Sequence, residues 1–152
     1  GRSSRSFLLF SSPIFPCRFQ HRTMADFNDI LQKIYSCRGS RTNEPQFYRE
    51  MITQKCVELN VDISKLRFVH IAGTKGKGST AAFVEQILRD RGLKTGLFTS
   101  PHLITPCERI QINGKAISEE MFSKCFHECF QHTEPSKTDL HFFQILFLMS
   151  LK

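Results

Sequence analysis

The sequence predicts an α/β fold built on a parallel sheet, and the order of its segments carries that prediction. A short apolar run at 67–72, which suits a buried strand, leads into a glycine-rich loop at 73–80. An amphipathic helix over 79–91 and a second apolar run at 94–99 follow. Strand, loop, helix and strand in this order are typical of the start of a parallel sheet covered by helices. Because such sheets usually have about four to six strands, we expect an incomplete parallel sheet with flanking helices, interrupted within the domain.

Helices and a hairpin are predicted around this central segment. Phe27, Ile30, Leu31 and Ile34 have the i, i+3, i+4, i+7 spacing of one helix face. Asn113-Gly114 is a strong hairpin signal. The same reasoning predicts helices at 26–37, 46–59, 118–130 and from about Asp139 onward, with hairpin strands at 109–112 and 115–117. The last apolar segment, at 142–151, is shorter than the ~20 residues of a membrane span, so we expect a buried helix and no transmembrane segment.

The positive charge of the chain is unevenly distributed. The formal net charge is +7, and residues 1–23 supply +4 through Arg2, Arg5, Arg18 and Arg22, without a single acid. The remainder carries +3, with its Lys and Arg scattered among acids. Since no basic stripe or stacking motif accompanies the charge, we do not expect a nucleic-acid partner.

Residues 1–23 have the composition of a mitochondrial presequence. They are rich in Arg and Ser, lack acids and contain an apolar run at 7–10. A secretory signal would have a longer apolar core and a small-residue cleavage site. We therefore expect a mitochondrial protein, in the matrix or associated with the inner membrane, and a cytosolic form that starts at Met24. A leader without any targeting role is the alternative.

The cysteine pattern does not favour a metal or disulfide protein. Cys125-x-His127-x-Cys129 could place two thiolates on one helix face, but no second ligand pair follows and structural zinc needs four ligands. A secreted disulfide scaffold of this size would be denser in cysteine. We expect thiols in a reducing compartment.

The loop GTKGKGST at 73–80 has residue types that suit phosphate. Its three glycines permit positive φ and let backbone N–H groups approach phosphate oxygens. The following helix directs the positive end of its dipole to the same place. Lys77 is expected to face solvent before ATP binds, and it can reach terminal phosphates. The hydroxyls of Ser79 and Thr80 can bind phosphate or magnesium. A glycine-rich turn with incidental lysines is the disfavoured alternative.

The loop departs from the common phosphate-loop pattern GxxxxGK[ST], and that departure is informative. Ile71 stands where the first glycine belongs, and Gly78 displaces the hydroxyl to Ser79. Together with TGLFTSPHL at 95–103 and ERIQING at 108–114, the loop closely resembles that of the folylpolyglutamate synthases, which are grouped with the Mur ligases that build bacterial wall peptides. The resemblance covers roughly residues 46–150 and, more weakly, 25–45.

The resemblance implies a fold like the central ATP-binding domain of the Mur ligases. Residues 24–152 would be the amino-terminal part of that domain, without the second domain that receives glutamate. The implied reaction is ATP-dependent addition of L-glutamate to the γ-carboxyl of the glutamate tail of a reduced folate, through an acyl phosphate. ATP and Mg²⁺ are the implied cofactors, and a monomer is expected. A dihydrofolate synthase or a bifunctional relative shares the loop, and an inactive remnant is the non-enzymatic alternative.

The resemblance also implies roles for individual residues. Lys77 is the expected catalytic residue, and Ser100 the expected magnesium ligand. Pro101, His102 and Arg109 would belong to a mobile loop that helps to form the folate site. The residues expected to bind ATP are Gly73, Thr74, Gly76, Lys77, Gly78, Ser79 and Thr80. The family's other metal ligands would lie beyond Lys152, so the chain alone is expected to be inactive.

Simpler explanations remain open for some of these side chains. The role of His102 is equally well explained by a hydrogen bond within its own loop and by a contact with a ligand. Arg109 could form only a surface ion pair with Glu108. His70 is expected to be a core histidine, and the Phe-rich stretch 142–147 is expected to be core rather than a stacking platform for folate.

Overall fold

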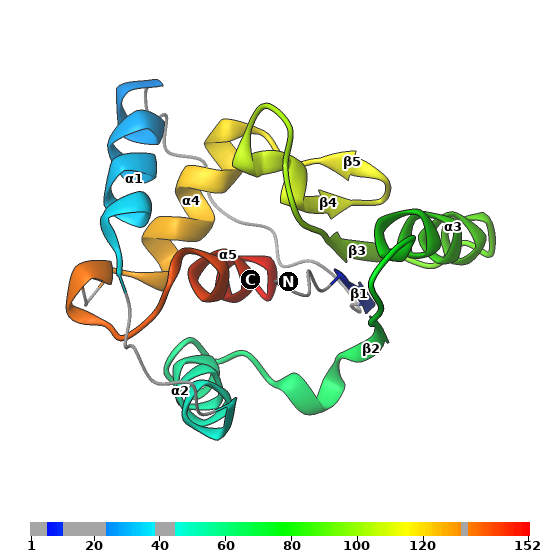
Figure 1. Cartoon of the computed structure of the whole chain (residues 1–152), viewed down its shortest axis with the longest axis horizontal. Coiled ribbons are helices and arrows are strands. Elements are labelled where there is room, and N and C mark those ends of the chain that lie inside the picture. The colour runs from blue at the N-terminus through cyan, green and yellow to red at the C-terminus, as the bar shows by residue number, and fades with distance from the viewer. Residues whose placement is uncertain (1–5, 11–23, 39–44, 132–133) are drawn as a thin grey trace. The chain divides into compact units, whose positions relative to one another are not determined.

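The structure, a computed structural model, describes residues 6–10, 24–38, 45–131 and 134–152 of the 152-residue chain. Figure 1 shows its elements in chain order. The chain divides into two compact units, one formed by residues 1–19 and 64–118 and the other by residues 20–63 and 119–152. The first contains the sheet and the second is helical.

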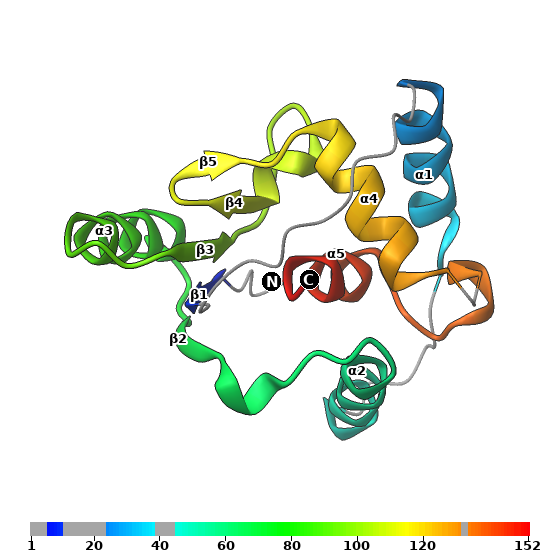
Figure 2. The ribbon, with the colours of Figure 1, turned by 180° about the vertical axis from the view of Figure 1, so that it is seen from behind.

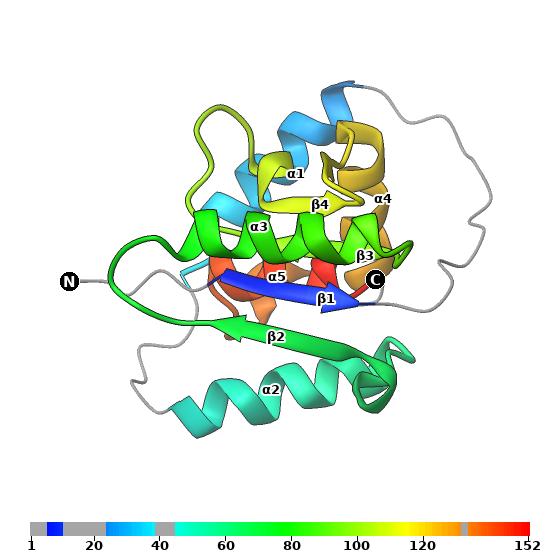
Figure 3. The same cartoon turned by 90° about the vertical axis from the view of Figure 1, so that its right-hand side faces the viewer.

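The first unit contains a five-stranded sheet in the order β2-β1-β3-β4-β5. Its strands are β1 (Ser6–Phe10), β2 (Arg67–Ile71), β3 (Thr95–Phe98), β4 (Ile110–Ile112) and β5 (Lys115–Ala116). Every hydrogen-bonded pair of these strands is antiparallel, as the opposed arrows of β1 and β2 in Figure 3 illustrate. Because β2 and β3 both run opposite to β1, they are parallel to each other.

Strand β1 is the main departure from the sequence-based expectation. It lies between β2 and β3, pairing Ser6 with Ile71 and Phe7 with Phe98. The α/β class is confirmed, and β2 and β3 keep the predicted parallel direction. They are not hydrogen-bonded to each other, because an apolar run of the leader satisfies both of their inner edges. The presequence interpretation of residues 1–23 falls largely outside the described residues and stays a prediction.

Helix α3 (Lys77–Asp90) connects β2 to β3 and packs on the sheet. Its Ala81 is fully buried with Leu97 of β3, and Val69, Ile71, Val84 and Leu88 pack around this pair. Strand β3 is mostly buried. The prediction of a buried strand is wrong for β2, which ends the sheet and is mostly exposed. His70, on this outer strand, is therefore exposed rather than a core residue.

The hairpin signal is confirmed in detail. Asn113 and Gly114 connect β4 to β5 with φ values of 49° and 76°. Positive φ at both central residues is the requirement of a type I′ turn, whose twist matches that of the strands it joins.

Among its described residues, the second unit contains four α-helices and the 3₁₀ helix Pro135–Lys137; Figure 2 shows the ribbon from behind. These are α1 (Met24–Ser36), α2 (Pro45–Glu58), α4 (Glu119–Cys129) and α5 (Phe142–Ser150). The predicted apolar face of α1 is buried at Phe27, Ile30 and Ile34, and the Phe27 ring meets that of Phe122 edge-on at 5.3 Å. Helix α5 buries Ile145, Leu146, Leu148 and Met149, so its segment is core as expected. Among the described residues, no helix is long and apolar enough to cross a membrane.

The surroundings of His127 and Cys129 on α4 indicate a role in packing and hydrogen bonding rather than in metal binding. The Nε2 atom of His127 lies 3.0 Å from both carboxylate oxygens of Asp26 on α1. Burial, reinforced by Cys125, raises the pKa of the Cys129 thiol to about 12, and a thiol rather than a thiolate is a poor metal ligand. Within the described ranges, no three His, Cys, Asp or Glu side chains are placed to hold a metal ion.

Candidate functional site

The glycine-rich loop joins the end of β2 to the start of α3. Gly73 has φ 154° and Gly76 has φ 73°, conformations that side-chain-bearing residues rarely adopt. Gly76 is the N-cap of α3 and provides no side-chain hydrogen bond to the helix. The first turn of α3 therefore presents backbone N–H groups without a capping side chain, which is the arrangement that helices use to bind anions. The helix begins at Lys77, two residues earlier than the sequence suggested.

Lys77 points into the loop rather than into solvent. Its side chain is 8% exposed, and Nζ donates to the carbonyl oxygens of Gly73 at 2.6 Å and Thr74 at 3.4 Å. The expectation that Lys77 faces solvent before ATP binds is therefore wrong, because the loop folds around the ammonium and supplies it with acceptors. An ammonium has three donors, and these two bonds hold its charge inside the loop.

The hydroxyl residues of the loop lie on the exposed first turn of α3. Thr80 donates its hydroxyl hydrogen to the carbonyl oxygen of Gly76 at 2.9 Å, so its oxygen is held in place with lone pairs still able to accept. Ser79 is exposed. Gly78 has no heavy atom within 4 Å of the position a Cβ would take. Gly78, Ser79 and Thr80 are all exposed.

Ser100 lies at the same edge of the sheet as the loop. It follows β3 by two residues, as the loop follows β2. The two parallel strands are in register through β1, since Ile71 and Phe98 pair with the adjacent residues Ser6 and Phe7. Their carboxyl ends therefore meet at one edge, which is where open α/β sheets bind their ligands. Ser100 is half-buried and joined to Pro101 by a cis peptide bond.

The segment after Pro101 is folded around the carboxylate of Glu108. Its Oε2 accepts the backbone N–H of Leu103 at 2.8 Å, and its Oε1 accepts those of Ile104 at 2.9 Å and Thr105 at 2.8 Å. These three backbone bonds hold the pKa of Glu108 below its ordinary value. Thr105 caps the 3₁₀ helix Pro106–Arg109 in return.

His102 and Arg109 form a second link across this segment. Arg109 donates from Nε to Nδ1 of His102 at 2.7 Å. Burial and the Arg109 charge lower the pKa of His102, against the opposing effect of Glu108. A neutral imidazole is the form that can accept at Nδ1. The structure thus places His102 in a loop hydrogen bond, one of the two roles left open, and gives Arg109 the imidazole as a partner.

Glu108 is the residue of this site whose role sequence reasoning missed. The signal was present, because Thr105-Pro106-Cys107-Glu108 has the S/T-x-x-E pattern of a capping box. Both reciprocal bonds of that box are formed. The bonds to Leu103 and Ile104 lie beyond the capping-box pattern and could be seen only in the folded loop.

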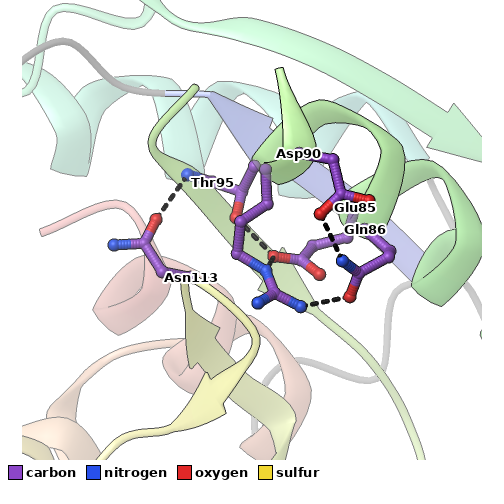
Figure 4. Close-up of polar contacts among 6 residues, drawn as sticks. Glu85, Gln86, Asp90, Thr95 and Asn113 are labelled. Atoms are coloured by element: carbon purple, nitrogen blue, oxygen red, sulfur yellow. Dashed lines mark hydrogen bonds and ion pairs between the residues drawn. The ribbon is translucent and has the colours of Figure 1, made fainter. Parts of the chain in front are cut away.

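A polar network fixes the far end of α3 (Figure 4). The buried carboxylate of Glu85 accepts from Thr95 Oγ1 at 2.5 Å and from Arg89 Nε at 3.2 Å. The backbone N–H of Thr95 donates to Asn113 Oδ1 at 2.9 Å. The network therefore joins α3, β3 and the hairpin, the three elements that orient the loop and the segment after β3.

A parallel strand pair joined by a glycine loop, a buried lysine and an uncapped helix start is the arrangement of a nucleotide-phosphate-binding α/β domain. No family model matches the sequence. The chain is 51% identical over 94 residues to the mitochondrial folylpolyglutamate synthase of Cricetulus griseus, covering 59% of this chain and 16% of that protein. It is 42% identical over 125 residues to a folylpolyglutamate synthase of Arabidopsis thaliana, covering 76% and 20%.

A solved structure has the same fold. The bifunctional folylpolyglutamate synthase/dihydrofolate synthase of Yersinia pestis, complexed with AMPPNP and Mn ion, matches with a TM-score of 0.64 at 24% identity, over 82% of this chain and 29% of that one. The chain is thus homologous to a segment of the folylpolyglutamate synthases, as its sequence indicated, and spans about a fifth of the length of these curated relatives.

Proposed function

We propose that the full-length protein containing this chain is a folylpolyglutamate synthase, an ATP-dependent ligase of one-carbon metabolism. It adds L-glutamate to the γ-carboxyl of the glutamate tail of a reduced folate through an acyl phosphate. The observation that carries this proposal is a buried, carbonyl-held Lys77 in the glycine loop of a chain 42–51% identical to curated enzymes of this name.

The loop fits the phosphates of ATP, which supplies the phosphoryl group that activates the carboxylate. The phosphate and the carboxylate are both negatively charged and repel each other, so the site must provide fixed positive charge to bring them together. Lys77 provides it at the centre of the loop, and the first turn of α3 adds backbone N–H donors. Loop carbonyls occupy two of the three ammonium donors of Lys77, which leaves one donor for the phosphate.

We propose that the divalent metal is Mg²⁺ and that the hydroxyl of Ser100 is one of its ligands. A hydroxyl is a weak neutral ligand, and Mg²⁺ demands near-octahedral oxygen coordination, so carboxylates, phosphate oxygens and water must complete the shell. The Mn ion of the Yersinia pestis structure supports a divalent metal. Pro101, His102 and Arg109 then belong to the folate side of the same sheet edge.

The proposed location is supported by the names of some relatives and by the composition of residues 1–23. Curated relatives named mitochondrial support import directed by residues 1–23. We propose a monomer without a nucleic-acid partner, and a cytosolic form starting at Met24. A reduced folate, L-glutamate and ATP are the proposed substrates.

The test uses the full-length protein with ATP, Mg²⁺, tetrahydrofolate and labelled glutamate. We expect folates of increasing tail length, detected by mass spectrometry. Lys77→Ala should abolish their formation, whereas Lys115→Ala, which removes an exposed lysine from β5, should not. Absence of product with the unaltered protein would refute the proposal. Labelling of dihydropteroate instead would identify a dihydrofolate synthase, and labelling of both substrates a bifunctional enzyme.

A further inference from the structure

Strand β1 occupies a position between two strands that follow each other in the chain. Strands β2 and β3 are joined through α3, and β1 separates them by pairing with both. Its backbone pairs with β2 along its whole length and with β3 from Phe7 to Phe10. An inner strand uses the N–H and C=O groups of both its edges, so β2 and β3 would each present an unpaired edge without it. A strand is therefore needed at this position in every folded form of the protein.

Strand β1 comes from the leader, residues 1–23, which the two proposed forms of the protein do not share. A start at Met24, or removal of a presequence that ends near Thr23, would take away all of β1. The other described strands, β2 to β5, already have their places in the sheet. Within the described ranges no further strand can replace β1, so the replacement must come from the rest of the full-length protein.

The direction of β1 matters for the site at the carboxyl edge of the sheet. It runs antiparallel to both neighbours (Figure 3), so its first residue, Ser6, lies opposite Ile71 at the edge where the phosphate loop and Ser100 follow their strands. Helical crossovers connect parallel strands, so a strand delivered by such a crossover would end at this edge instead. Mg²⁺ needs more oxygen ligands than Ser100 provides. The sequence that precedes Ser6, GRSSR, contains no carboxylate to supply one.

Two strands can compete for this position, because strand pairing uses main-chain hydrogen bonds that any extended segment can form. We propose that β1 is an autoinhibitory strand: while the leader is attached, residues 6–10 hold the place that a strand from the rest of the protein takes in the active enzyme. Loss of the leader then activates the protein. The inference rests on the proposed function and goes beyond it by giving the leader a regulatory role in addition to targeting.

The first measurement tests whether β1 is paired in the full-length protein. Amide hydrogen exchange is measured on the leader-bearing protein, on Leu8→Pro and on Ser12→Pro. Leu8 lies in the middle of β1, opposite Val69 and Leu97, where proline removes a donor and breaks an inner strand. We expect protected amides at residues 7–10 in the unaltered protein and in Ser12→Pro, which lies outside β1, and rapid exchange of this segment in Leu8→Pro. Rapid exchange in the unaltered protein would overturn the proposal.

The second measurement tests the inhibition. Formation of glutamylated tetrahydrofolate is compared for the leader-bearing protein, Leu8→Pro, Ser12→Pro and the form that starts at Met24. We expect kcat of the leader-bearing protein and of Ser12→Pro to be on the order of tenfold below that of the other two. A tenfold reduction corresponds to β1 holding the position in about nine of ten molecules. Equal kcat values in all four proteins would show that β1 does not inhibit and would refute the inference.

A disulfide lock tests the same point while β1 stays paired. Phe10 and Arg67 are paired at the end of β1 away from the phosphate loop, and directly opposite residues of an antiparallel pair lie close enough for a disulfide. The double variant Phe10→Cys/Arg67→Cys is oxidised with diamide, with Phe10→Cys alone as the control for the natural cysteines. Oxidation should abolish the remaining turnover of the double variant, and dithiothreitol should restore it. A disulfide verified by mass spectrometry without loss of turnover would contradict autoinhibition.

The outcomes separate this inference from the proposed function. If the leader-bearing protein and the Met24 form add glutamate to folate equally well, the inference fails while the synthase function stands. If Leu8→Pro does not fold, the Met24 form and the disulfide lock decide. If no form makes a folate product, the proposed function fails and its autoinhibition fails with it, whereas hydrogen exchange still shows whether β1 holds its place in the sheet.

Discussion

Replacement of Thr95 by valine should measure what the network at the far end of α3 contributes to stability. Thr95 is 3% exposed, and its hydroxyl donates to the Glu85 carboxylate at 2.5 Å; Glu85 itself is 4% exposed. Valine has nearly the same shape and removes only the donor. The backbone bond from Thr95 to Asn113 is unaffected by the change, because it uses the main-chain N–H.

The size of the expected stability loss in Thr95→Val follows from the burial of the hydrogen bond and the charge of its acceptor. A hydrogen bond to a charged group is worth about 1.5–3 kcal/mol, and a buried carboxylate that loses a donor cannot replace it with water. Glu85 keeps Arg89, at 3.2 Å, so the ~3–5 kcal/mol of a wholly unpaired buried charge does not apply. We expect Thr95→Val to lower the free energy of unfolding by about 2 kcal/mol, equivalent to roughly 4–8 °C in Tm for a chain of this size.

Urea unfolding of the chain followed by circular dichroism provides the measurement. Thr95→Ser keeps the hydroxyl and should cost less than Thr95→Val. Thr53→Val is the matched control, because the Thr53 hydroxyl makes an exposed bond to the Arg49 carbonyl on α2 and its loss should stay within about 0.5 kcal/mol. A Thr95→Val cost no larger than that of Thr53→Val would refute the reasoning that burial makes this bond valuable.

Four further outcomes are expected. Lys77→Ala should lower ATP-dependent turnover of the full-length protein by orders of magnitude without loss of helix content; near-normal glutamate incorporation would contradict its role. Residues 1–30 fused to a fluorescent protein should reach mitochondria, whereas a start at Met24 should leave the protein diffuse; diffuse fluorescence with the leader present would count against import. The 152-residue chain alone should transfer no labelled glutamate to folate, because magnesium needs about six oxygen ligands and the chain offers one assigned ligand; any ATP-dependent transfer would overturn this. Since backbone donors lower the pKa of Glu108, its bonds to the loop should be complete above the ordinary carboxyl range and be lost as pH falls through the lowered pKa. His102 and Arg109 are the neighbouring charged or titratable groups. An NMR titration that loses the amide signals near pH 6 would be inconsistent with this direction.

The sequence by itself determined most of the local structure and the chemistry of the loop. Phe27, Ile30 and Ile34 marked a helix face that is buried, and Asn113-Gly114 specified a turn that only positive φ permits. The glycines of the loop predicted a backbone with positive φ for the same reason. These features depend on residues close in sequence, so their spacing carries the information.

Only the tertiary structure decided the features that depend on distant partners. The parallel directions of β2 and β3 follow from the βαβ order, but the strand lying between them comes from residues 6–10, and no local pattern specifies that pairing. Lys77 is buried because the loop carbonyls close around its ammonium. Glu108 holds three amide groups of an upstream loop, a role that its spacing to Thr105 indicated for one of them only. In each case the physical reason is that hydrogen-bond donors and acceptors pair with groups that come close only in the folded chain. The spacing of residues along the sequence does not indicate which groups these are.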